Sequence, residues 1–173
     1  MYYRTNGGAL EANSLLNFIN EKSTINGIVN SIKGGTIGGN IYFIAPKGIV
    51  IGSSGVINAG SIGLMTPSQE FYDSVMNGGK IDQSKLTEDM IKNIEAADIP
   101  LNLNGSISIS GKLNAVDGIK VASAAIELKN EAQLVSTKDI DFSALVNVEG
   151  VDSGPDSSKL KLHAPKTPTA QLI

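Results

Sequence analysis

The stretch GVINA at residues 55–59 decides the fold of this chain, because its pattern occurs at two other places. GIVNS at residues 27–31 and GKLNA at residues 111–115 also read glycine, any residue, a branched apolar residue, asparagine and a small residue. The branched residue is expected to point inward, and the glycine and the small residue permit a tight corner beside it. A phrase that returns in this form is typical of a chain built from similar structural units.

The spacing of the three copies predicts coils with one insertion. The first two copies start 28 residues apart, and the last two start 56 residues apart. Residues 67–99 lack the pattern of strands, and without these 33 residues the second spacing is 23. That length suits one turn of a β-solenoid. We therefore predict coils of roughly two dozen residues, with a helical hairpin inserted at a corner.

Two helix starts are predicted inside this insertion. In the first, Thr66 is the expected N-cap, Pro67 takes the first helical position and Gln69 completes a capping box. The pair at residues 78–79, Gly-Gly, is expected to end this helix. The second helix is expected to start at Thr87 and to end before Pro100. The apolar stripes of the two helices are Phe71, Tyr72, Val75 and Met76, and Met90, Ile91 and Ile94.

Six short segments, each bounded by glycine, asparagine, proline or serine, are predicted to be strands. They are residues 40–44, 48–52, 61–65, 105–110, 119–122 and 125–128. Stacked coils with parallel strands would place Ile28, Ile57 and Leu113 in one interior column. The asparagines that would form a ladder at equivalent corners are Asn30, Asn58 and Asn114.

These strands also fit a β-sandwich, but the repeated phrase favours an all-β solenoid. We predict one domain over residues 1–151, with residues 1–21 as an N-terminal segment. Within that segment, residues 9–20 are expected to form a short helix or strand over the first coil. Residues 152–173 contain serines, lysines and three prolines and are expected to be a linker or disordered tail.

Composition excludes several functions. Hydrophobic residues make up 41% of the chain but aromatic residues only 5%, which favours thin, repetitive β structure. A net charge of −3 and a single arginine, Arg4, argue against nucleic acid as a partner. No run approaches the roughly 20 apolar residues that span a bilayer, so no membrane insertion is predicted. The absence of cysteine excludes disulfides and thiol chemistry.

No catalytic, cofactor or metal site is predicted, and the chain is not expected to be an enzyme. His163 is the only histidine and is expected to be exposed and idle in the tail, which leaves too few ligands for zinc. Asp139 and Asp141 alternate as in a strand and would share one face, where calcium or paired acid catalysis is conceivable. Solvent-exposed carboxylates beside Lys138 are the preferred interpretation. Glycine pairs in the chain lack the lysine and the following helix of a phosphate loop.

The stretch GNIYFIAPKGIVIG at residues 39–52, together with GVINAGS at residues 55–61, resembles a known family. The family is the haemagglutination-activity domain of two-partner secretion, as found in filamentous haemagglutinin exoproteins. Within it, the chain looks most like the leukotoxin-type filamentous adhesins, whose phrase is followed by a Thr-Pro segment and a helical insertion. The resemblance covers residues 22–150. Members typically carry Asn-Pro-Asn-Gly at the central turn, where this chain has Ala45, Pro46, Lys47 and Gly48.

The resemblance implies a right-handed parallel β-helix from the N-terminal end of a long exoprotein. It implies a non-enzymatic secretion and adhesion module, secreted or on the surface of a Gram-negative bacterium and associated with virulence. The partners would be an outer-membrane secretion pore of the two-partner type and the host cell surface. The family's signal peptide and N-terminal capping strands should precede Tyr2, so the chain looks like a fragment. The alternatives are a β-helical polysaccharide lyase or hydrolase and a trimeric solenoid spike protein.

Overall fold

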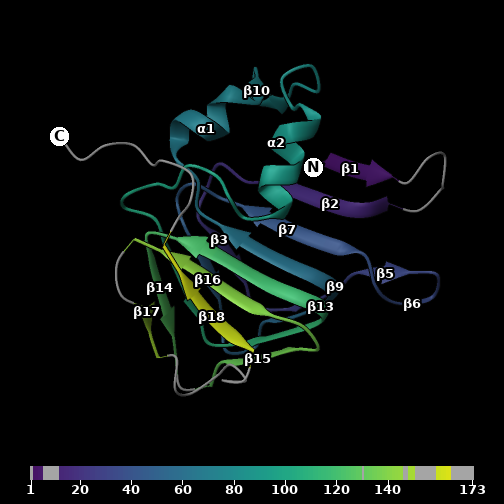
Figure 1. The fold of residues 1–173 in the computed structure, drawn as a ribbon, viewed down its shortest axis with the longest axis vertical. Coiled ribbons are helices and arrows are strands. Elements are labelled where there is room, and N and C mark those ends of the chain that lie inside the picture. Colours follow the sequence, from purple (N-terminus) through teal and green to yellow (C-terminus); the bar gives the residue numbers. More distant parts are fainter. Residues whose placement is uncertain (1, 6–11, 130, 146–147, 151–158, 165–173) are drawn as a thin grey trace.

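The structure of the protein is a computed structural model that describes residues 2–5, 12–129, 131–145, 148–150 and 159–164 (Figure 1). The described chain is mostly β, with parallel sheets, as predicted for an all-β protein. Nearly all strands belong to one of two sheets, which we call sheet A and sheet B. Apolar side chains from both sheets meet in one core cluster.

Sheet A has the strand order β1-β2-β7-β9-β13-β16-β18, with β4 beside β9 and β15 beside β13. Its strands are β1 (Tyr2–Thr5), β2 (Ala12–Phe18), β4 (Ile28–Asn30), β7 (Asn40–Ile44), β9 (Val56–Met65), β13 (Lys112–Ser123), β15 (Gln133–Ser136), β16 (Ile140–Ala144) and β18 (Leu160–His163). Sheet B has the order β17-β14-β12-β8-β3. Its strands are β3 (Ser23–Ile25), β8 (Ile49–Ile51), β12 (Ser106–Ile109), β14 (Ala125–Leu128) and β17 (Val148–Glu149).

The chain passes alternately through the two sheets, and each new strand pairs in parallel with a strand of the previous pass. Only β1, which pairs with β2, is antiparallel within these sheets. β1 and β2 therefore form one edge of sheet A among the described strands. The predicted helix or strand over residues 9–20 is a strand from Ala12 onward.

The pairing register brings the three copies of the repeated phrase side by side. Ile57 lies opposite Val29 and Leu113, and Asn58 lies opposite Asn30 and Asn114. Side chains alternate between the two faces of a strand, so the third and fifth positions of the phrase face the core. The predicted interior column is therefore wrong in one member. Val29 takes the inward position, and the side chain of its neighbour Ile28 is 69% exposed.

The repeated phrase begins a strand and does not itself form a corner. Its glycines lie where the chain crosses from sheet B to sheet A. At the later copies the backbone there packs closely against neighbouring backbone, as predicted. A Cβ atom added at Gly111 would lie within 3.0 Å of the carbonyl oxygens of Gly55 and Gly52. A Cβ atom at Gly27, in the first coil, would meet no atom within 4 Å. Close packing of the backbone between neighbouring parallel strands thus explains the glycine in the later copies.

Two helices form in the predicted insertion, and Figure 1 shows them together at one end of the molecule, beside β2 and β7. They are α1 (Gln69–Ser74) and α2 (Glu88–Glu95). The N-cap Thr87 of α2 is confirmed, because its side chain accepts a hydrogen bond from the Met90 N–H. None of the described helices is long and apolar enough to cross a membrane.

Two details of the first helix differ from prediction. Ser68, and not Thr66, is the N-cap, and its hydroxyl accepts a hydrogen bond from the Phe71 N–H. Thr66 is fully buried and its hydroxyl pairs with that of Ser123 at 2.6 Å, so it cannot cap the helix. The glycines at residues 78–79 do not end α1. They form the turn between β10 (Met76–Asn77) and β11 (Lys80–Ile81), where both have positive φ.

The insertion packs on the outer face of sheet A through a second apolar cluster. Outward side chains of the sheet, including Leu16, Ile44 and Met65, pack there with Ile91 and Ile94 of α2. This cluster is separate from the core between the two sheets. The helices therefore cover one part of the outer face and leave the rest to solvent. A second small hairpin, β5 (Ile32–Lys33) with β6 (Thr36–Ile37), leaves the first coil before β7.

The predicted tail contains a strand. β18 pairs in parallel with β16, in a register that places Leu160 opposite Ile140 and His163 opposite Ser143. The expectation of a linker or disordered tail is therefore wrong for residues 160–163, while most of residues 152–173 lie outside the described part. The pattern of lysines and prolines hid an alternation of apolar and polar residues in LKLH.

The C-terminus of α2 contains a strained residue that is open to a stability test. Ala97 has a φ of 56° and is the only non-glycine residue with positive φ in the described part of the chain. It occupies the position after the C-cap Ala96, where its N–H bonds to Ile94 O and the Asp98 N–H bonds to Asn93 O. This is a Schellman motif, in which glycine is preferred.

Replacing Ala97 with glycine is expected to raise the free energy of unfolding by about 0.5–1 kcal/mol, because the steric cost of positive φ disappears. Urea denaturation followed by circular dichroism measures the change. Ala96→Gly is the matched control, because φ at Ala96 is −87° and glycine there should destabilise the helix. Equal effects of the two substitutions would contradict the assignment of strain to Ala97.

Candidate functional site

The turn predicted from the family resemblance connects β7 of sheet A to β8 of sheet B. The Gly48 N–H donates to Ala45 O at 3.1 Å and closes the turn, and Gly48 O accepts from the Ser23 N–H at 2.9 Å. Gly48 has a φ of 120°, a conformation that side chains other than glycine rarely adopt. The backbone conformation at this position therefore favours glycine, which this turn shares with the turn of the family that the sequence resembles.

Most of this turn is inaccessible to a partner. Ala45, Pro46 and Gly48 are buried, and the side-chain amide of Asn102 donates to Pro46 O at 2.8 Å. Lys47 is the exposed residue, and its ammonium lies 3.5 Å from the carboxylate of Glu21. A protein that binds here would meet this lysine and glutamate pair. Since Ala45 has no exposed surface, a side chain at that position would contribute little to recognition.

The three repeated asparagines form a ladder on the outer face of sheet A. The Asn58 amide donates to Asn30 Oδ1, and the Asn114 amide donates to Asn58 Oδ1, each at 2.8 Å. The asparagines lie within strands and not at corners. Their amides bond to one another along the stacking direction, so the ladder holds the register of successive strands.

A charged cluster that the sequence did not predict lies on the outer face of sheet A, beyond the helices. It consists of Lys120 on β13, Asp139 and Asp141 on the β16 segment, and Lys161 and His163 on β18. Lys161 Nζ lies 2.8 Å from Asp139 Oδ2, and His163 Nε2 lies 2.8 Å from Asp141 Oδ1. Lys120 Nζ lies 3.4 Å from the other oxygen of Asp141.

Pairing within this cluster affects the titration of two members. The hydrogen bond from Lys161, assisted by the charges of Lys120 and His163, lowers the pKa of Asp139. The same contact raises the pKa of Lys161. Both shifts favour the charged forms, as expected for opposite charges in contact.

The cluster shows how Asp139 and Asp141 are paired. The two carboxylates do share one face, but each contacts a cation of the same face. In the described ranges, no group of three or more His, Asp or Glu side chains could hold a metal ion. Shallow pockets border the cluster beside Ala96, Ala97 and Glu95 at the end of α2. The arrangement is a network of satisfied ion pairs on a sheet surface.

His163 is exposed, as expected, but it contacts Asp141, which was not predicted. The signal for this contact was present in the sequence. DIDFS at residues 139–143 and KLKLH at residues 159–163 have the same alternation, with acidic residues in one and basic residues in the other. Placed in register, they bring opposite charges together on one face. One row of register neighbours on the outer face of sheet A changes from apolar to polar where the helical insertion no longer covers the sheet. This row consists of Ile44, Met65, Ala122, Ser143 and His163.

Comparison with known proteins adds no assignment. No family model matches the chain, and no curated protein or solved structure matches it.

Proposed function

We propose that the chain is a right-handed parallel β-helix that serves as a non-enzymatic secretion and adhesion module. It would belong to a large secreted filamentous adhesin or leukotoxin-like exoprotein of the two-partner type. The observation that carries this proposal is the parallel, in-register pairing of strands from successive passes through the two sheets. The right hand follows from the strong preference of parallel crossover connections.

Two further features support the proposal. The helical insertion follows directly on Thr66-Pro67, as in the adhesins that the sequence resembles. Coils that contact only their neighbours can also fold one after another as a chain emerges from a pore. Such stepwise folding needs no distant segment, which suits export in one direction.

The secretion pore is proposed to contact the surface around the turn at residues 45–48. Lys47 is the exposed residue of the turn itself, and Glu21 and Lys22 are exposed beside it. A charge pair of this exposure contributes little to folding, so it is available for recognition by complementary charges. Host cell surfaces would be partners after export.

Lys47→Glu is expected to reduce binding to the periplasmic domains of a two-partner secretion pore by about tenfold, because it reverses the charge and places two carboxylates together. Surface plasmon resonance with the purified periplasmic domains measures the affinity. Lys80→Glu, which makes the same charge change in the exposed β10–β11 turn, is the control and should bind like the parent. Thermal melting of both variants should match the parent within a few degrees.

Equal binding by the two variants would contradict recognition at this turn, and the absence of any binding by the parent would contradict the secretion role.

The alternatives have their own tests. Unsaturated products from pectin, alginate or hyaluronan, lost in Asp139→Asn or Asp141→Asn variants, would identify a lyase. A stable trimer in sedimentation would favour a spike protein.

A further inference from the structure

β18 is fastened to the rest of sheet A differently from the strands within the sheet. It is the edge strand and pairs only with β16 among the described strands. Leu160 is only partly buried and Leu162 is 57% exposed, whereas Phe142, the register partner of Leu162, is fully buried. Leu160 packs against the core between the sheets, so apolar burial contributes to the attachment of β18, but less than it does for the inner strands.

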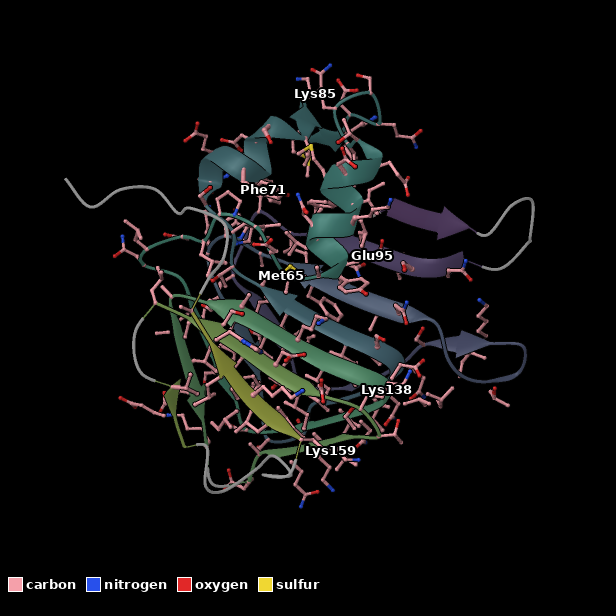
Figure 2. All side chains as sticks on the ribbon, in the orientation of Figure 1. Met65, Phe71, Lys85, Glu95, Lys138 and Lys159 are labelled. Carbon is pink, nitrogen blue, oxygen red and sulfur yellow. The ribbon has the colours of Figure 1, made fainter. Side chains whose placement is uncertain are left out.

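Charged side chains on the outer face make up much of the remaining attachment. Lys159 Nζ donates to Thr137 O at 3.1 Å, and Figure 2 shows Lys159 at the end of sheet A far from the helices. Lys161 pairs with Asp139, and His163 pairs with Asp141. Every second side chain of this segment, from Lys159 to His163, thus contacts an acceptor on the chain around β16. The Ile140 N–H adds a backbone bond to Lys159 O.

We propose that β18 is an electrostatically fastened strand that detaches and reattaches with pH and ionic strength while the rest of the chain stays folded. Detachment would uncover the hydrogen-bonding edge of β16 and the aromatic ring of Phe142 beneath it. An exposed strand edge next to an apolar side chain is a template for pairing with another strand. The device would thus control access to that edge of sheet A.

The direction of the pH response follows from the groups that face these contacts. The lowered pKa of Asp139 means that its contribution is present above the unfolded pKa and is lost as the pH falls through the folded value. The raised pKa of Lys161 means that its contribution is lost only as the pH rises through that value in alkaline solution. His163 and Asp141 form an ion pair only while the imidazole is protonated.

Attachment should therefore weaken toward strongly acidic pH, as Asp139 becomes protonated, and toward strongly alkaline pH, as Lys161 loses its proton. Besides Lys120 of the cluster itself, the charged groups that face these contacts from neighbouring elements are Asp117, Lys138, Glu95 and Asp98. They carry both signs, so they do not reverse these directions.

Hydrogen exchange with mass spectrometry on the whole chain tests the proposal. At mildly acidic pH, exchange in peptides covering residues 139–144 and 159–163 is expected to be about fivefold faster in 1 M NaCl than in 0.05 M NaCl, because salt screens exposed pairs. Peptides from β9 should not change. Asp139→Asn should raise exchange in the same peptides at low salt. Exchanging the charges, with Asp139→Lys and Lys161→Asp together, should restore slow exchange.

Glu127→Gln is the matched control, because it breaks the pair of Glu127 with Lys129 within one segment and should leave β18 unaffected. Circular dichroism confirms that each variant is folded. Exchange at β18 that does not respond to salt would overturn the proposal. So would exchange at β18 that rises only together with that of β9, because the strand would then open only by global unfolding.

Discussion

Gly111→Val is expected to prevent folding of the chain, while Gly27→Val is expected to change the free energy of unfolding by less than about 1 kcal/mol. The two glycines hold the same place in the repeated phrase, so any view of the sequence alone treats them alike. The difference comes from their neighbours in space. At Gly111, an added Cβ would lie within 3.0 Å of the carbonyl oxygens of Gly55 and Gly52, and at Gly27 it would meet nothing within 4 Å.

The obstacle at Gly111 is backbone, which cannot move aside without separating two coils. Overpacking at a rigid site costs about 1–3 kcal/mol or more, and the lost strand pairing of β13 with β9 would add to it. The sum approaches the 5–15 kcal/mol that usually stabilises a domain. Gly55→Val should resemble Gly111→Val, because its Cβ would lie within 3.0 Å of Ile25 O.

Circular dichroism and urea denaturation of the three variants measure this effect. The ranking tests the close approach of the parallel strands directly, since among the three glycines a Cβ atom added at Gly27 alone meets nothing within 4 Å. If Gly27→Val and Gly111→Val were equally stable, the close approach of residues 111 and 55 would be wrong. The parallel pairing on which the proposed function depends would then also be in doubt.

Local features of the sequence were enough to locate many elements. The strands over residues 40–44 and 125–128 have the predicted bounds, and Thr87 begins α2 as predicted. These segments are marked by the turn residues that bound them and by apolar or β-branched content, signals that act over a few positions. The asparagine ladder was also predictable, because three equal phrases in parallel coils must bring equal residues together.

Features that depend on register were not predictable locally. Ile28 and Val29 are adjacent and both apolar, so only the pairing with β9 decides that Val29 faces the core. Thr66 has an N-cap sequence, but burial against Ser123 assigns it another role. The charged cluster forms only because β18 pairs with β16, a strand that is distant from it in sequence. In the turn at residues 45–48, likewise, the sequence alone could not show that Lys47 is the exposed residue.

Phe142→Ala is expected to lower the free energy of unfolding by about 3–5 kcal/mol, the second large effect. The ring is fully buried in the core between the sheets, where its register neighbours include Val121. Truncation to alanine leaves a cavity that strands paired on both sides of β16 cannot easily close. Urea denaturation measures the loss.

Leu162→Ala is the matched control for this substitution. Leu162 lies directly opposite Phe142 on β18 and points to the same side of the sheet, but it is 57% exposed. Its truncation should cost less than about 1 kcal/mol, because little apolar area returns to water. A large loss at Leu162 would show that β18 is held by apolar contacts, which would contradict electrostatic fastening of this strand. A small loss at Phe142 would place its ring outside the core and remove the reason why detachment of β18 would expose an apolar edge.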